Sequence, residues 1–234
     1  MLKALLPLSL KQKLRKYVKS QLGLREPAEP GPEYYERRKD IEDSIPKLNL
    51  QQKHINHLKV LLDRQSLLDA LPAGAVVAEI GVNEGEFSEM ILKTTKPSKL
   101  HLVDAWGDPT RYTDDLKLKV KDKFKAEIAA GKVEINVGFS TDVLAKFPDR
   151  YFDWVYVDTD HTYTTTAAEL GILRTKMKPG GIIAGHDYTL GNWISGFRYG
   201  VIEAVHELCV KDDWELVYLT SETHQCRNFA IRKL

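Results

Sequence analysis

Short apolar runs alternate with stretches of helical periodicity from residue 75 onward. The runs with strand character are VVAEIG, LHLVDA, VEINVG, FDWVYVD, GIIAGHD, WELVYLTS and NFAIRKL. The helical stretches between them are Phe87–Thr94, Leu116–Ala130, Val143–Lys146, Tyr163–Met177 and Tyr199–Lys211. This alternation predicts an α/β fold, in which helices cover both faces of a doubly wound, mostly parallel sheet of seven strands.

The connection between the last two predicted strands is the six-residue stretch ETHQCR. A right-handed crossover between parallel strands needs a longer connection, usually one that contains a helix. We therefore expect the sheet to finish in an antiparallel hairpin.

The first 72 residues follow a different pattern and divide into three segments. Residues 1–25 are rich in lysine and arginine and contain no acid, and apolar residues recur at every fourth position from Leu10 to Leu22. This spacing predicts a basic amphipathic helix. Residues 26–35 hold three prolines and a glycine and indicate a linker, and residues 36–72 have helical character. The α/β domain is thus expected at residues 73–234.

The basic amphipathic helix has two interpretations. A helix of this kind can lie on an anionic membrane surface, which would give the protein a peripheral contact with the inner membrane. Alternatively it packs on its own domain or across a homodimer, with its lysines in solvent. The pattern alone does not choose between them.

Composition narrows the class of protein. The chain has 234 residues, 43% of them hydrophobic, with a net charge of +1 and two cysteines. This balance does not indicate a nucleic-acid-binding protein or a disulfide framework. No apolar run approaches the roughly 20 residues of a spanning helix, and we expect no secretory signal and a cytoplasmic protein.

A glycine-containing turn follows the first strand of the α/β domain, with Gly81 and Gly85 between the acids Glu79, Glu84 and Glu86. Glycines there allow a ligand to approach the backbone closely. The spacing is G-x-x-x-G, which weakens a dinucleotide interpretation, and no G-K-[ST] of a phosphate-binding loop is present. Carboxylates beside the turn disfavour a pyrophosphate and favour a cationic ligand.

Asp104 ends the second strand, about 20 residues after the glycines, where an acid can bind both hydroxyls of a ribose. S-adenosylmethionine combines a ribose with an amino acid and a sulfonium, and it has no phosphate. It is therefore the cofactor that the turn and Asp104 favour. The structural alternative is that Glu79 merely closes the strand and Gly81 merely makes a turn.

These motifs, together with VGFSTDVL, FDWVYVDTDHTY and KMKPGGIIAGHDY, resemble those of class I S-adenosylmethionine-dependent methyltransferases. The closest group is that of the macrocin-type sugar O-methyltransferases, and the resemblance runs from about Ala75 to Leu234. It implies that Glu79, Gly81 and Gly85 surround the methionine part and that Asp104 binds the ribose. We expect Glu84 and Asp158 to contact the cofactor as well. Ser140 and Thr141 fall where the family contacts the adenine.

Two further acids follow neighbouring strands, Asp158 in VDTDHTY and Asp187 in GHDY. Two converging carboxylates either share a proton or bind a cation, and oxygen ligands favour Mg²⁺ or Mn²⁺, with His186 as an additional ligand. Asp160 or His161 is placed to act as a general base. The resemblance implies the same arrangement, although those enzymes often have an acid where this chain has His186. The alternatives are base catalysis without a metal, and a polar loop that only caps the next helix.

The sequence thus predicts an enzyme that transfers a methyl group from S-adenosylmethionine to a hydroxyl of a sugar or glycan, such as a lipid-linked polysaccharide, with assistance from a divalent metal. Aromatic residues in the segment 187–201, among them Trp193 and Phe197, are candidates to cover the acceptor, as is Tyr112. The alternatives are a metal-free methyltransferase of another small molecule, a nicotinamide-dependent oxidoreductase and a non-catalytic cofactor-binding scaffold.

Overall fold

The computed structural model describes residues 31–234 apart from 107–113, 193 and 223–225. The chain separates into two compact units, residues 1–44 and 45–234. In the first unit the described element is α2, Pro32–Ser44. The predicted basic helix at residues 1–25 lies outside the described residues, so its membrane or dimer contacts stay predictions. No described helix has both the length and the apolar character needed to cross a membrane.

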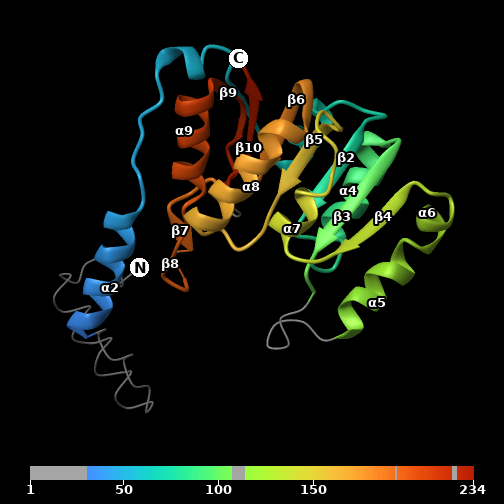
Figure 1. Cartoon of the computed structure of the whole chain (residues 1–234), viewed down its shortest axis with the longest axis horizontal. Helices are drawn as coiled ribbons and strands as arrows, with labels where there is room; N and C mark the ends of the chain where they lie inside the picture. Colours follow the sequence, from blue (N-terminus) through green and yellow to red (C-terminus); the bar gives the residue numbers. More distant parts are fainter. Residues whose placement is uncertain (1–30, 107–113, 193, 223–225) are drawn as a thin grey trace, which may run out of the picture. The chain divides into compact units, whose positions relative to one another are not determined.

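The second unit is built on an eight-stranded sheet with the order β1-β9-β10-β6-β5-β2-β3-β4. The strands are β1 (Lys59–Leu61), β2 (Val76–Ile80), β3 (Lys99–Asp104), β4 (Val133–Val137), β5 (Phe152–Val157), β6 (Met177–Gly185), β9 (Trp214–Thr220) and β10 (Phe229–Lys233). The helices are η2 (Gln52–His54), α3 (Arg64–Ala70), α4 (Glu86–Thr95), α5 (Asp114–Lys123), α6 (Lys125–Ala129), α7 (Ser140–Leu144), α8 (Tyr163–Lys176) and α9 (Val201–Asp212). Figure 1 shows their arrangement.

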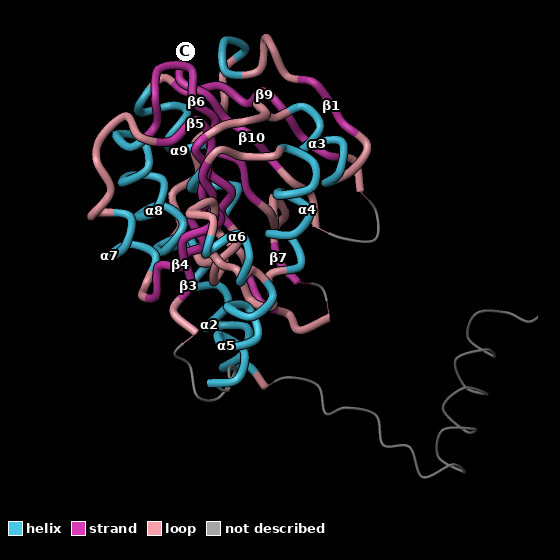
Figure 2. Tube along the Cα trace, turned by 90° about the vertical axis from the view of Figure 1, so that its right-hand side faces the viewer, coloured by secondary structure: helices cyan, strands magenta, loops and turns pink. Residues whose placement is uncertain are grey.

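Helices cover both faces of the sheet, as the apolar runs predict, and Figure 2 shows the strands between them. Alternate strand residues point to opposite faces. Val155 and Val157 of β5 thus belong to the core beneath α7, α8 and α9, and Trp154 and Tyr156 to the core beneath α3, α4 and α5. The doubly wound α/β fold is confirmed.

The last two strands form the expected hairpin. β10 pairs antiparallel with both β9 and β6, and it therefore lies inside the sheet. At the other side of the centre, β2 pairs parallel with β3 and with β5. The strand order changes direction at β2, so the carboxyl ends of β3, β2 and β5 border a single crevice.

The structure corrects three details of the sequence-based expectation. The helix predicted across 36–72 is wrong at Lys59–Leu61, because these residues form β1, an eighth strand that pairs parallel with β9. The helix predicted from Leu116 to Ala130 is divided at Phe124 into α5 and α6. The segment after Asp187 contains a separate hairpin, β7 (Gly191–Asn192) with β8 (Phe197–Arg198), before α9 begins at Val201.

The helix after β1 is part of the sheet domain, and a matched pair of leucines tests this. Leu67 on α3 is fully buried, whereas Leu62 is 76% exposed. We expect Leu67→Ala to lower the free energy of unfolding by about 2–5 kcal/mol, the cost of a buried cavity. Leu62→Ala should change it by less than about 0.5 kcal/mol. Chemical denaturation measures both, and equal effects would show that α3 does not contribute to the core.

Candidate active site

A pocket of about 940 Å³ opens at the carboxyl ends of β2, β3 and β5. This volume suits a nucleoside-sized ligand. The sequence-predicted residues that line it are Glu79, Gly81, Glu84, Asp104, Ser140, Thr141, Asp158, Asp160 and His161. The crevice at the change of strand order therefore gathers most of the residues that the sequence singles out.

The turn after β2 packs tightly against the end of β5. Gly81 has φ +88°, and a Cβ added there would lie 1.8 Å from the carbonyl oxygen of Asp158. Gly85 has φ +71°, and its added Cβ would lie 2.8 Å from the ring of Phe124. Both glycines are therefore required by the backbone path and by their neighbours.

Asp104 holds this turn from the neighbouring strand. Its Oδ2 accepts hydrogen bonds from the backbone N–H groups of Val82 (2.8 Å) and Asn83 (2.9 Å), and its Oδ1 accepts one from that of Trp106 (2.8 Å). The indole Nε1 of Trp106 donates in turn to the carbonyl of Asn83 at 3.0 Å. Asp104 thus shapes the turn, and Oδ1 keeps a free lone pair for a ligand hydroxyl.

Glu79 lies beneath the turn and is only 2% exposed. It accepts a hydrogen bond from the hydroxyl of Ser88. Burial raises the pKa of Glu79 to about 8, which outweighs the lowering by Ser88. The carboxyl is thus largely protonated at neutral pH, in contrast to the charged group that the sequence suggests, whereas Glu84 is exposed at the pocket.

At the β4 side, Ser140 and Thr141 begin α7 and line the pocket beside Phe139. The phenyl ring of Phe139 is 73% exposed, so it is available to stack on a ligand. The hydroxyl of Thr159, which also lines the pocket, donates a hydrogen bond to the carboxylate of Glu169 on α8 at 3.0 Å. Burial raises the pKa of Glu169 to about 7. Sequence reasoning missed Phe139 and Glu169, because a lone Phe and a helical Glu carry no local signal.

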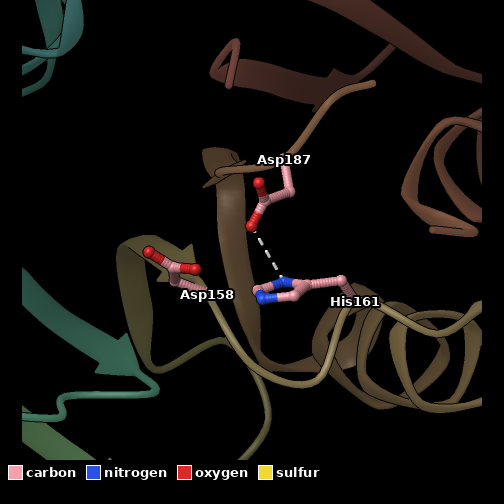
Figure 3. A group of neighbouring side chains, drawn as sticks. All are labelled: Asp158, His161 and Asp187. Atoms are coloured by element: carbon pink, nitrogen blue, oxygen red, sulfur yellow. Dashed lines mark ion pairs between the residues drawn. The ribbon is translucent and has the colours of Figure 1, made fainter. Parts of the chain in front are cut away.

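Asp158, His161 and Asp187 converge beside this pocket, with one ligand atom of each within 4.8 Å of the others (Figure 3). The Nδ1 of His161 lies 3.0 Å from Oδ2 of Asp187, and the two side chains point toward one another. Asp187 is 4% exposed, and His161 lines the pocket. An acid thus orients an imidazole whose Nε2 remains for a substrate, which is the arrangement of a general base.

His186 approaches the same carboxylate oxygen of Asp187 as His161 does. Its Nδ1 is 3.3 Å from Oδ2 of Asp187 and 3.6 Å from Oδ2 of Asp158. Burial alone would lower the pKa of His186, but these two carboxylates raise it to about 9. Burial alone would raise the pKa of Asp187, yet its hydrogen bonds with His161 and His186 hold that pKa well below its usual range. His186 is thus a protonated neighbour of the cluster at neutral pH.

The backbone is strained at this cluster. His161 has φ +63° and Asp187 has φ +57°, in the left-handed region that non-glycine residues rarely adopt. The carbonyl of His161 is held by the N–H of Gly200 at 2.8 Å. A Cβ on Gly200 would lie 2.3 Å from Tyr163, so the close contact that holds His161 requires glycine. Strain of this kind is concentrated at functional sites.

The carboxylate of Asp160 accepts hydrogen bonds at the start of α8. Its Oδ1 accepts from the N–H of Thr162 at 2.9 Å, and its Oδ2 accepts from the hydroxyl of Thr165 at 2.7 Å. The sequence leaves the base role open between Asp160 and His161. These bonds favour His161, because both carboxylate oxygens of Asp160 already accept hydrogen bonds from the first turn of α8 and from its N-cap residue Thr162.

Aromatic residues of the segment after Asp187 lie beside the cluster. The ring centroid of Tyr199 is 4.9 Å from that of His161, and Phe197, on β8, is 5.8 Å from Tyr199 and 47% exposed. The predicted candidates Trp193 and Tyr112 lie outside the described residues. Trp106 is 5% exposed and supports the turn.

The pocket also contains Arg64, which sequence reasoning missed. It is the first residue of α3, and its Nη2 lies 3.7 Å from Oδ2 of Asp158. A basic residue at the start of a short helix carries no sequence signal for a pocket, because only the unexpected strand β1 brings this helix to the site.

Residues 78–188 match the family model described as a methyltransferase domain. A comparison with curated proteins found no significant match to the chain.

Solved structures of similar fold include the pyocyanin biosynthetic protein PhzM, with a TM-score of 0.53 and 13% identity over 69% of this chain and 51% of that one. The trans-methyltransferase CalH, solved with S-adenosylhomocysteine, has a TM-score of 0.51 and 16% identity over 73% of this chain and 55% of that one. An S-adenosylmethionine-dependent methyltransferase from Mesorhizobium loti has a TM-score of 0.52 and 11% identity over 71% of this chain and 96% of that one.

The chain spans about half the length of PhzM and CalH and nearly all of the Mesorhizobium loti protein. At these identities the structural likeness concerns the fold, whereas the family match concerns the segment from β2 to the residue after Asp187. That segment holds the glycine turn, Asp104 and the His161–Asp187 pair. Residues 78–188 of the chain thus match a methyltransferase domain, and they lie within a fold shared with solved methyltransferases.

Proposed function

We propose that this domain transfers the methyl group of S-adenosylmethionine to a hydroxyl of a sugar or glycan, with His161 as the general base. The observation that carries the proposal is the 3.0 Å pair between His161 and Asp187 beside the cofactor pocket. An alcohol is a poor nucleophile at neutral pH, so a base within reach of the acceptor is the group that oxygen methylation needs.

In the proposed reaction, the acceptor oxygen attacks the methyl carbon of the sulfonium from the side opposite the sulfur. The C–S bond breaks as the O–C bond forms, and S-adenosylhomocysteine leaves. The hydroxyl proton passes to Nε2 of His161, while Asp187 stabilises the imidazolium through Nδ1. Alignment of the oxygen, the methyl carbon and the sulfur supplies much of the rate.

The cofactor role of the predicted residues is part of the same proposal. Asp104 accepts a ribose hydroxyl on Oδ1, Ser140 and Thr141 contact the adenine, and Gly81, Glu84 and Gly85 border the methionine part. The buried Glu79 supports the turn through Ser88.

The sugar acceptor is supported by the resemblance of the motifs to those of sugar O-methyltransferases, and by the exposed ring of Phe197 near the cluster. Aromatic faces are suited to stack on sugar rings. A metal-free methyltransferase of another small molecule would use the same base and differ only in the surface that receives the acceptor.

The proposal also includes a divalent metal ion that assists the reaction. The donors Asp158, Asp187 and His161 lie within 4.8 Å of one another, and two carboxylates with an imidazole suit Mn²⁺ and, through the carboxylates, Mg²⁺. These residues would hold the ion, and such an ion lowers the pKa of a bound hydroxyl. If Nδ1 of His161 stays on Asp187, the carboxylates alone bind the metal and His161 remains the base.

The cofactor is tested by thermal shift and by a pair of glycine variants. S-adenosylhomocysteine at 100 times its dissociation constant should raise the melting temperature by about 2–8 °C, whereas NAD and NADP should not. Gly81→Ala should abolish this shift, because its Cβ overlaps the carbonyl of Asp158. Gly171→Ala, on α8 with no atom near the added Cβ, should retain it. A shift with a nicotinamide cofactor alone would contradict the proposal.

The base is tested by comparing His161→Gln with Asp160→Asn. We expect His161→Gln to lower kcat by about 10²–10⁴-fold, the usual contribution of a general base. Affinity for S-adenosylhomocysteine should be unchanged, and Asp160→Asn should stay active, because the amide oxygen of asparagine can still accept from the N–H of Thr162. Methyl transfer to a hydroxylated acceptor and isothermal titration calorimetry give the two quantities. The reverse ranking would assign the base to Asp160.

The metal is tested by chelation. If Asp158 and Asp187 hold a divalent ion, EDTA should reduce activity, and Mg²⁺ or Mn²⁺ should restore it. Asp158→Asn should then bind the ion more weakly than Asp160→Asn, since only Asp158 belongs to the cluster. Full activity of the chelated enzyme would exclude the metal and leave base catalysis by His161.

A further inference from the structure

Arg64 is the only lysine or arginine among the described residues that line the pocket. Six carboxyl-bearing residues line the same pocket: Glu79, Glu84, Glu86, Asp104, Asp158 and Asp160. One cation in an acidic pocket marks the place where a negatively charged group of a ligand is best accommodated. Arg64 also lies outside residues 78–188, so the family match assigns it no role.

The guanidinium of Arg64 is held in place by aromatic rings. Its Cζ lies 4.8 Å from the ring centroid of Phe87 on α4 and 5.6 Å from that of Tyr156 on β5. The side chain is 19% exposed, and Nε is buried without a hydrogen-bond partner. Stacking of this kind fixes the plane of the guanidinium and leaves its edge for a carboxylate.

The backbone of Arg64 is fixed by Glu222, which follows the end of β9. Its N–H donates to Oε1 of Glu222 at 2.7 Å, and the other oxygen of Glu222 accepts from the amide of Asn228 at 2.7 Å. The preceding residue, Asp63, caps α3 by accepting from the N–H of Ser66 at 2.8 Å. The strand β1 and the β9–β10 connection thus present Arg64 to the pocket in a defined position.

The nearest acid to the guanidinium is Asp158, whose Oδ2 is 3.7 Å from Nη2. This distance is too long for a hydrogen bond, so the guanidinium edge is not saturated. An arginine that is stacked, mostly buried and incompletely paired has the capacity to accept a second carboxylate in a bidentate manner.

Arg64 lies where the amino-acid end of S-adenosylmethionine is expected in the pocket. Asp104 and Ser140 place the nucleoside toward β3 and β4, whereas Arg64 and Asp158 lie toward β5, on the other side of β2. The amino-acid end of S-adenosylmethionine therefore extends toward Arg64. That end carries one carboxylate, and the many acids of the pocket repel it unless a cation receives it.

We propose that Arg64 binds the α-carboxylate of the methionyl group of S-adenosylmethionine, so that residues outside the matched family segment complete the cofactor site. This inference rests on the proposed cofactor. Arg64 then selects ligands that carry the amino-acid end over ligands that carry only the nucleoside and the sulfur.

The test compares two ligands on three variants by isothermal titration calorimetry. S-adenosylhomocysteine carries the carboxylate, and 5′-methylthioadenosine has the same nucleoside and sulfur without the amino acid. Arg64→Met keeps an unbranched side chain over the two rings but removes the charge. We expect it to weaken S-adenosylhomocysteine by about 10- to 100-fold, the range for a hydrogen bond to a charged group, and to leave 5′-methylthioadenosine unchanged. Arg64→Lys should lose less, and Arg174→Met, on the far part of α8, should lose nothing.

Equal losses for the two ligands in Arg64→Met would assign Arg64 a structural role and overturn the proposal, as would an unchanged affinity for S-adenosylhomocysteine. A measurement on the unmodified protein does not depend on how the variant folds. The methyl ester of S-adenosylhomocysteine, which lacks the carboxylate charge, should bind as weakly as S-adenosylhomocysteine binds to Arg64→Met. Failure of the unmodified protein to bind any of these adenosine ligands would instead contradict the proposed cofactor.

Discussion

The close approach of Gly81 to the backbone of Asp158 is the contact on which the site depends. It brings the turn after β2 against the end of β5, where the absence of a Cβ leaves just enough room for the carbonyl. The N–H of Gly81 donates to Val103 of β3, and the N–H of Asp158 donates to Ile80, so the three central strands are tied together at their ends. Because Asp158 and His161 come directly after β5, the glycine turn and the candidate base are positioned by the same contact. A change in one is therefore transmitted to the other through backbone atoms.

The fold of the α/β domain follows from the sequence because its signals are local. Seven apolar runs, the helical stretches between them and one short final connection determine the doubly wound sheet and its antiparallel end. The strand β1 has three residues, two of them exposed, and it exists because β9 offers a free edge. No periodicity within the segment reveals a partner strand that lies 159 residues further along the chain.

The positions of the candidate site residues follow from the sequence to a similar extent and for similar reasons. Residues that follow strands, such as Asp104, Asp158 and Asp187, were predictable because parallel strands bring their carboxyl ends together. The roles of Asp160 and Glu79 were not, since they depend on hydrogen bonds to Thr165 and Ser88 and on the degree of burial. Arg64 shows the limit most clearly. Its position requires β1, α3 and the end of β9 to be in place at once.

The inner location of β10 has a consequence for the order in which the domain is assembled during synthesis. β10 is later in the chain than every other strand, yet it lies between β6 and β9. Until β10 leaves the ribosome, one edge of β6 has no neighbouring strand. The pair β9 and β1 has no strand through which to hydrogen-bond to the rest of the sheet. The five strands from β2 to β6 are able to pair as they emerge, but β9 and β1 join the sheet only when β10 fills the place between β6 and β9. The hydrogen bonds of β9 and β1 to the rest of the sheet are therefore the last that the domain can form during synthesis.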